Sequence, residues 1–293
     1  MPRIITTLEY LQDLELYRSE KPYFCLMPAT NNEEIHNEQL DNLQFESHPN
    51  VEIEDLRTIE GHFTLRDCGF EVVPHTSQIL DLESDNGLNS TMSLAEYQLE
   101  TEDFLTAHLA ASFVKCYDIV MRKNVVFDES FFDMKDRMHA VGPARGAHND
   151  VTYNSGPVII NRYLSTDEKQ QYLKPGYRLR IINTWRSLLP TLEDRPLAVC
   201  DSRTVAPSDL IACDRVLPDR VGEVYYLKYS PLHKWYWISN QTSSEPYVFV
   251  LYDTKSGTHA RFCPHVSFPN PEAPKDAPPR RSVETRSIVI TRE

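Results

Sequence analysis

The sequence lacks a basic surface signature. No stretch is rich in lysine and arginine, and the formal net charge of the 293-residue chain is −13. A nucleic-acid binder needs a basic footprint that displaces the counterions of the phosphates, and an acidic surface disfavours anionic membranes. We therefore expect neither nucleic acid nor a membrane among the partners of this protein.

Long apolar runs and paired cysteine motifs are also missing. The N-terminal segment has no unbroken apolar core, which argues against a secretory signal. The longest apolar run, around residues 247–252, is far shorter than the roughly 20 residues that span a bilayer. The six cysteines are widely spaced without a CxxC motif, which is typical of reduced thiols. These absences predict a cytoplasmic protein.

The chain shows no internal repeat, and its length fits one large core. We expect a single domain over residues 1–293. In this domain, residues 1–140 supply N-terminal strands and a helix that frame the core, and residues 141–293 supply most of the core. Residues 93–123 carry the strongest helical pattern, with Ser93 as the N-cap and Glu96 at the capping-box spacing. Residues 113–121 also alternate, so a strand is the alternative for the end of this stretch.

After residue 140, short β-type runs alternate with turn segments. The expected strands are 158–163, 177–185, 196–200, 223–229, 235–239, 247–252, 266–268 and 282–291, and residues 165–173 are expected to form one short helix. Many short strands with turns between them are typical of an antiparallel sandwich or barrel. We predict a mainly β fold with peripheral helices and a double-stranded β-helix (jelly-roll) core.

One motif has the spacing of a metal site in such a fold. Non-haem iron(II) sites use two histidines and one carboxylate on one face of the metal, and residues i and i+2 of a strand share a face. The triplets His148-Asn149-Asp150 and His36-Asn37-Glu38 both have this spacing, and the composition predicts between one and two such triplets by chance. The second triplet lies in a polar acidic segment. The first leads into an apparent strand, and its context therefore favours His148 and Asp150.

The other histidine ligand must come from a distant strand, and His233 and His265 are the candidates. A dicarboxylate co-substrate needs a buried arginine for its distal carboxylate, on the last strand of the jelly roll. Arg280, Ser282 and Arg286 share a strand face there, and Arg280 follows His265 by 15 residues. This order favours His265 as the metal ligand.

Taken in order, these motifs resemble the fungal Fe(II)/2-oxoglutarate-dependent oxygenases. This family includes gibberellin desaturase, the aspergillic acid hydroxylase, the cephamycin methoxylation protein and the novofumigatonin endoperoxidase. The resembling segments are VEIEDLR (51–57), FTLRDCGFE (63–71), PA (143–144) ahead of HND (148–150), NTWR (183–186), PLAVCD (196–201), HKWYW (233–237), YDT (252–254), PHVSF (264–268) and PRRSVETR (279–286). Ser187 departs from the pattern, because the family usually has proline after the Trp-Arg pair.

The resemblance implies an enzyme that uses Fe(II), 2-oxoglutarate and O2 to oxidise a specialised metabolite in fungal biosynthesis, by hydroxylation, desaturation or endoperoxide formation. His148, Asp150 and His265 would bind the iron. The substrate would be a small molecule, such as a polyketide, a terpenoid or a peptide-derived metabolite.

The same resemblance implies a binding site for the far carboxylate of 2-oxoglutarate on the last strand. Arg280 or Arg286, together with Ser282, would bind it, and the sequence leaves the choice between the two arginines open. Arg186 is a further candidate for the co-substrate or for a substrate carboxylate, with a structural ion pair as its alternative role.

Four residues are candidates for the wall of the substrate pocket, with core packing as the alternative for each: Phe127, Tyr153, His233 and Trp235. Two other functions compete with the oxygenase. A different metal-dependent jelly-roll enzyme of the cupin type would keep the metal ligands but would not need Arg280 or Arg286. In a non-catalytic binding module, His148 and Asp150 would be ordinary hydrogen-bonded residues and no metal would bind. A homodimer is the default expectation for the assembly.

Overall fold

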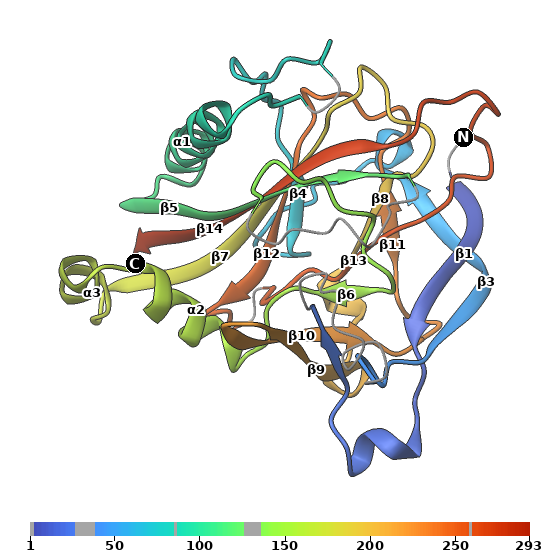
Figure 1. Cartoon of the computed structure of the whole chain (residues 1–293), viewed down its shortest axis with the longest axis horizontal. Helices are drawn as coiled ribbons and strands as arrows, with labels where there is room; N and C mark the ends of the chain where they lie inside the picture. The colour runs from blue at the N-terminus through green and yellow to red at the C-terminus, as the bar shows by residue number, and fades with distance from the viewer. Residues whose placement is uncertain (1–2, 27–38, 85–86, 126–135, 258–259) are drawn as a thin grey trace.

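The computed structural model describes residues 3–26, 39–84, 87–125, 136–257 and 260–293. In these residues, the strands form one sheet of nine strands and one of five (Figure 1). The order of strands in the larger sheet is β1 (Arg3–Leu11), β3 (Phe45–Asp55), β11 (Trp235–Trp237), β8 (Leu197–Cys200), β13 (His265–Ser267), β6 (His148–Asn149), β10 (Arg220–Leu227), β9 (Leu210–Leu217) and β2 (Tyr23–Cys25). Apart from the hairpin of β9 and β10, neighbouring strands in this order are not consecutive in the chain, so the sheet brings distant segments together.

The smaller sheet carries the longest strands of the second half of the chain. Its order is β4 (Phe70–Val72), β12 (Tyr247–Asp253), β7 (Tyr177–Ser187), β14 (Arg281–Arg292) and β5 (Phe113–Lys123). The helices are α1 (Thr91–Leu109), α2 (Ser155–Tyr163) and α3 (Thr166–Tyr172), and short 3-10 turns cover Glu15–Arg18, Leu56–Thr58, Ser202–Thr204 and Pro207–Asp209. The mainly β, jelly-roll fold predicted from the sequence is confirmed.

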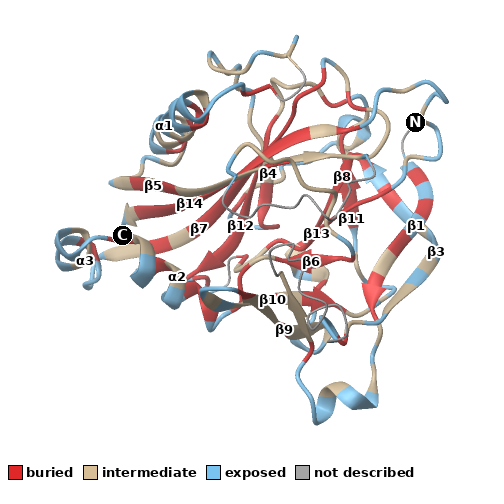
Figure 2. Cartoon of the chain, viewed as in Figure 1, coloured by how far each residue is buried: buried red, intermediate tan, exposed pale blue. Residues whose placement is uncertain are grey.

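The burial pattern follows from how each strand is covered (Figure 2). Along β1 buried and exposed residues alternate, because one face of this strand meets the core and the other meets solvent. Strand β12 is buried at every residue. Its inner face meets the larger sheet, and Val248 and Val250 on its outer face pack in a cluster with Leu105 of α1. The smaller sheet therefore lies between α1 and the larger sheet.

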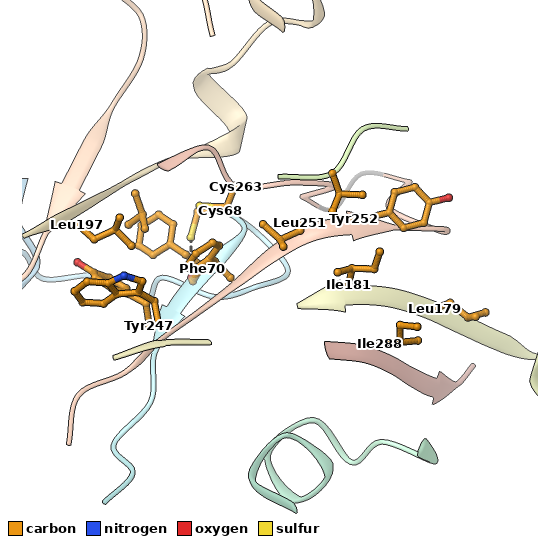
Figure 3. Close-up of a cluster of buried hydrophobic side chains, with 14 of the residues drawn as sticks. Cys68, Phe70, Leu179, Ile181, Leu197, Tyr247, Leu251, Tyr252, Cys263 and Ile288 are labelled. Carbon is orange, nitrogen blue, oxygen red and sulfur yellow. Dashed lines mark hydrogen bonds between the residues drawn. The ribbon is translucent and has the colours of Figure 1, made fainter. Parts of the chain in front are cut away.

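The main core fills the space between the two sheets, and Figure 3 shows part of it. Ile181, Tyr247, Leu251 and Ile288 come from three strands of the smaller sheet, and Leu197 comes from the larger one. On β14 the same inward face carries Ile288 and Ile290 at one end and polar residues at the other. The apolar end of this face thus contributes to the core, and the polar end supplies buried side chains that can bind a ligand.

Two predicted elements are wrong in detail. The helix predicted over residues 93–123 begins earlier and ends at Leu109, and its expected last part forms β5, as the alternation there indicated. Ser90 is the N-cap of α1 and Ser93 its capping-box partner, whereas Glu96 has no part in the cap. Residues 158–163, predicted as a strand, lie in α2, because the spacing of their apolar residues fits a helix as well as a strand. Within the described residues, no helix is long and apolar enough to cross a bilayer.

The observed cap makes a stability prediction that separates the two assignments. The Ser90 hydroxyl accepts a hydrogen bond from the Ser93 amide at 3.1 Å, so Ser90→Ala should lower the free energy of unfolding by about 1 kcal/mol. Glu96→Ala should change it by less than about 0.5 kcal/mol. Urea unfolding of both variants measures this, and a larger loss in Glu96→Ala would contradict the observed cap.

Candidate metal and co-substrate site

Three predicted ligands meet at the centre of the larger sheet. His148 on β6 and His265 on β13 are direct cross-strand partners, and Asp150 follows His148 by two residues. The Nε2 atom of His148 lies 3.9 Å from Oδ1 of Asp150, and Nε2 of His265 lies 3.6 Å from Oδ2. One possible ligand atom from each of the three residues lies within 4.8 Å of the others. Two imidazoles and one carboxylate match the donor set of a non-haem iron(II) site.

Backbone carbonyls fix the orientation of both imidazole rings. Nδ1 of His148 donates to the carbonyl of Gly146 at 2.9 Å, and Nδ1 of His265 donates to the carbonyl of Cys263 at 3.2 Å. A carbonyl can only accept, so each Nδ1 carries a proton and each Nε2 can present its lone pair toward Asp150. Gly146 adopts a φ of 75°, and a Cβ there would lie 2.3 Å from the ring of Phe45. This glycine therefore permits the turn that orients His148.

Arg286 on β14 holds Asp150 in its ionised form. Its Nε and Nη2 atoms donate to the two carboxylate oxygens of Asp150 at 3.2 and 3.1 Å. Burial alone would raise the pKa of Asp150, but Arg286, with His265 and His148, lowers it well below its usual range. The carboxylate is thus charged before any cation binds.

A buried ion-pair chain extends from Asp150 across the smaller sheet. Arg286 also donates to Glu284 at 2.8 Å and to Asp118 at 2.6 Å, and Arg122 clasps Glu284 through two nitrogen atoms at 3.1 and 2.8 Å. Burial would raise the pKa of Glu284, but Arg122 and Arg286 lower it to about 2. Among the described residues every donor nitrogen of Arg286 is therefore used by a carboxylate.

Arg280 contrasts with Arg286, because no carboxylate pairs directly with its guanidinium within the described residues and its charge is only partly compensated. Arg280 is only 2% exposed, its Nε donates to Ser282 at 3.1 Å, and its Nη1 has no partner among the described residues. Its guanidinium lies 5.2 Å from the ring centre of Trp185. Burial, with the like charge of Arg122, lowers the pKa of Arg280 to about 9. An anion at this point would satisfy both the charge and the free donor.

Further unpaired polar groups lie on the inner face of the smaller sheet beside Arg280. Within the described residues, both amide atoms of Asn183, the indole nitrogen of Trp185 and the hydroxyl of Tyr247 are buried without a hydrogen-bond partner. Strand register places Asn183 opposite Arg286 on one side and opposite Phe249 on the other, and Phe249 contacts the ring of His265. Such a concentration of unsatisfied groups is unusual in a core and fits a polar ligand between Arg280 and the His-Asp-His cluster.

A cavity of about 720 Å³ opens beside the cluster. His148, Asp150 and Arg286 form part of its wall, and Tyr117 and Tyr226 add aromatic surface. A second cavity of about 380 Å³ adjoins it and shares Tyr117, Asp150 and Arg286. The cluster therefore faces a space large enough for an organic substrate.

The remaining predicted site residues do not converge on this cavity. Arg186 is engaged by the Tyr97 hydroxyl at 3.1 Å and by the backbone carbonyls of His75 and Ser243. These contacts favour the structural alternative for Arg186. Tyr153 is 60% exposed beside Arg261, away from the walls of both cavities.

Trp235 and His233 both pack against the ring of Tyr10. The indole nitrogen of Trp235 donates to the Tyr10 hydroxyl at 2.9 Å. His233 stacks on Tyr10, and its Nε2 lies 3.1 Å from Asp209. Neither residue lines the cavities beside the His-Asp-His cluster, so packing is the better account of both. Phe127 lies outside the described residues.

Three residues beside the cluster or its cavities were not predicted from the sequence: Asn183, Glu284 and Arg215, which lines both cavities. Glu284 lies between Ser282 and Arg286 on the same strand face, so alternation along the last strand could have found it. Asn183 was seen only as part of a resembling segment, and its burial without a partner is a tertiary property. Arg215 lies on β9, a strand that the sequence did not predict.

The buried His265 makes a pH prediction for the metal-free protein. Burial, with the neighbouring His148, lowers its pKa from 6.5 to about 4 although Asp150 opposes the shift. Between pH 4 and 6.5 this histidine is protonated in the unfolded chain and neutral in the folded chain, so the free energy of unfolding falls as the pH drops from 6.5 to 4. The effect is on the order of 3 kcal/mol. Urea unfolding at both ends of this range in the presence of a chelator measures it. An equally steep fall in His265→Gln would contradict the assignment.

Comparisons with known proteins agree with this geometry. A family model described as an oxidoreductase/YMDC permease-like domain (YDMC) matches residues 8–290. The hydroxylase/desaturase efuI of Hormonema carpetanum is 30% identical over 256 residues, which are 82% of this chain and 83% of that protein. The Fe(II)/2-oxoglutarate-dependent dioxygenase nvfI of Aspergillus novofumigatus is 34% identical over 150 residues, which are 50% of this chain and 52% of that one.

The solved structures support the same fold. A variant of the iron and alpha-ketoglutarate-dependent endoperoxidase NvfI superposes with a TM-score of 0.82 at 24% identity, over 100% of this chain and 99% of that one. The chain belongs to the oxidoreductase family whose model matches residues 8–290. The resemblance to the fungal Fe(II)/2-oxoglutarate-dependent oxygenases seen in the sequence is confirmed. With it, the predicted class of enzyme, a non-haem iron dioxygenase that acts on small molecules, is confirmed as well.

Proposed function

We propose that His148, Asp150 and His265 bind the iron, and that Arg280 with Ser282 binds the distal carboxylate of 2-oxoglutarate. The observation that carries this proposal is the contrast between two buried arginines. Arg286 is saturated by carboxylates, whereas Arg280 keeps a free donor beside Ser282. Arg286 then serves to position Asp150 rather than to bind the co-substrate.

In this assignment the protein mainly orients the metal ligands and excludes water from the site. When bound, iron(II) and 2-oxoglutarate supply the activation of O2 and the removal of a hydrogen atom from the substrate. The carbonyls of Gly146 and Cys263 keep both imidazoles in the tautomer that leaves Nε2 available. Arg286 keeps Asp150 charged, and the apolar core between the sheets excludes water from one side of the site.

Asn183 and Trp185 complete the co-substrate pocket in this proposal. Both present buried, unpaired hydrogen-bonding groups on the face that carries Arg280 and Arg286. A dianionic ligand can accept from the indole and amide N–H groups as well as from the guanidinium. The pocket is thus matched to a dicarboxylate rather than to a neutral ligand.

The wider setting follows from the same assignment. The substrate is a specialised metabolite of the polyketide, terpenoid or peptide-derived kind, and the cavity beside the cluster holds it. A cytoplasmic location is supported by six cysteines that are all free. The single domain over residues 1–293 and the homodimer stay predictions.

The proposal is tested by metal content and co-substrate turnover together. Dialysis of the full chain against iron(II) without oxygen should leave one iron per chain. Admission of O2 with 2-oxoglutarate should then release succinate slowly even without the organic substrate. Iron retention without any succinate would argue for another metal-dependent enzyme on this fold, and loss of all iron would remove the proposed site.

A further inference from the structure

The described wall of the cavity beside the His-Asp-His cluster carries more arginines than carboxylates, although the whole chain is acidic. Among the described residues six arginines and three aspartates line it, whereas the chain has a formal net charge of −13. A concave surface of one sign in a protein of the opposite sign concentrates ligands of complementary charge. The question is which arginine is available to such a ligand.

Five of the six arginines have polar partners. Arg286 and Arg122 belong to the buried ion-pair chain. Arg145 pairs with Glu9, Arg220 pairs with Asp219, and Arg137 donates to Gln98 at 2.7 Å. For Arg215, no hydrogen bond or ion pair is formed by the guanidinium within the described part of the chain.

The position of Arg215 explains why it has no partner. It lies on β9 directly opposite Gly222 of β10, which has no side chain to offer. Arg215 contributes to the walls of both adjoining cavities. Burial, with the like charge of Arg286, lowers its pKa, and the carboxylates of Asp118 and Asp150 only partly offset this. Its charge is therefore only partly compensated by its neighbours.

Apolar groups surround this cation on the same walls. Leu217, Val224, Tyr226 and Tyr117 line the larger cavity together with Arg215. A ligand that satisfies the guanidinium and also covers these side chains must combine an apolar body with an anionic group. A carboxylate suits best, because its two oxygens match the planar guanidinium fork.

We propose that Arg215 binds a carboxylate on the organic substrate, so that this enzyme oxidises an apolar carboxylic acid. The inference rests on the proposed function of the site and adds the chemical class of the substrate. It also separates the roles of two arginines with free donors: Arg280 takes the co-substrate, and Arg215 takes the substrate.

The test uses a matched pair of probes, 1-pyrenebutyrate and its methyl ester. Both are titrated into the full chain loaded with Fe(II) and 2-oxoglutarate without oxygen, and binding is followed by fluorescence anisotropy. The acid should bind roughly 10- to 100-fold more tightly than the ester, as expected for a charge-assisted hydrogen bond. Arg215→Met should remove this preference and leave the ester unchanged, and Arg215→Lys should keep part of it.

Two controls separate this inference from the proposed function. Arg3→Met removes an exposed arginine paired with Glu52 on β1 and should not alter either probe. The affinity for 2-oxoglutarate should stay the same in Arg215→Met, and its loss there would assign Arg215 to the co-substrate and overturn the inference. Equal binding of acid and ester to the unmodified chain, failure of the acid to bind, or an unchanged preference in Arg215→Met would also overturn it. Absence of iron binding would instead contradict the proposed function, while the acid preference can still be measured on the metal-free chain.

Discussion

The variant His265→Gln is expected to bind iron(II) at least about 100-fold more weakly than the unmodified protein. Loss of a partner that merely orients a metal ligand costs roughly 10- to 100-fold in affinity, and His265 would be a ligand itself. Its Nε2 faces Asp150 at 3.6 Å, and its cross-strand partner is His148. Anaerobic equilibrium dialysis with iron analysis measures the change, and succinate release should fall with it.

His233 offers a matched control for this variant. It is a buried histidine of the same sheet region, its Nε2 lies 3.1 Å from Asp209, and it was the rival ligand in the sequence. His233→Gln should lower the free energy of unfolding because it disturbs a packed pair, yet it should keep one iron per chain. Full iron binding by His265→Gln, or loss of iron in His233→Gln alone, would assign the site to the wrong histidine.

The second large effect is expected at Arg280. Truncating one partner of a buried, hydrogen-bonded charge pair costs about 2–5 kcal/mol, so Arg280→Met should weaken 2-oxoglutarate binding by about 30-fold or more. Pyruvate has the keto acid end of 2-oxoglutarate and lacks the distal carboxylate. Its binding to the iron-loaded protein should therefore be the same in Arg280→Met and in the unmodified chain. Anaerobic calorimetric titration with both ligands measures the two affinities.

The same variant should show an opposite effect on stability. Arg280 is buried with a free Nη1 and an incompletely compensated charge, and apolar replacements of such groups are often neutral or stabilising. We expect Arg280→Met to unfold at an equal or higher urea concentration than the unmodified protein when no co-substrate is present. If 2-oxoglutarate and pyruvate were weakened equally, or if 2-oxoglutarate affinity were unchanged, Arg280 would have no role in binding the distal carboxylate.

The sequence predicted the fold well where periodicity is local. The alternating run at residues 282–291 became β14, and the turn-bounded run at 247–252 became β12. It failed where one pattern fits two structures: the apolar residues of 158–163 suit a strand as well as the helix α2 that they form. Strand β9 was missed because Arg215 and Asp214 interrupt its apolar pattern.

The candidate site was predicted through order along the chain more than through any single motif. The spacing of His148 and Asp150, followed by His265, placed three residues that the fold brings together, and the same order pointed to Arg280, which is buried beside Trp185. The choice between Arg280 and Arg286 depended on which carboxylates lie nearby, and no sequence pattern reports that. Arg215 likewise differs from the other arginines of the cavity wall only because it has no partner among the described residues. That depends on which residue lies opposite it in the neighbouring strand, here Gly222.

The most direct test of the account is the visible spectrum of the full chain under anaerobic conditions, first with iron(II) and then with 2-oxoglutarate. The account predicts a weak charge-transfer band that appears only with both ligands, saturates at one equivalent of each, and is missing in His265→Gln. Iron binding without such a band at saturating 2-oxoglutarate would contradict it and would point to a metal-dependent jelly-roll enzyme that does not use this co-substrate.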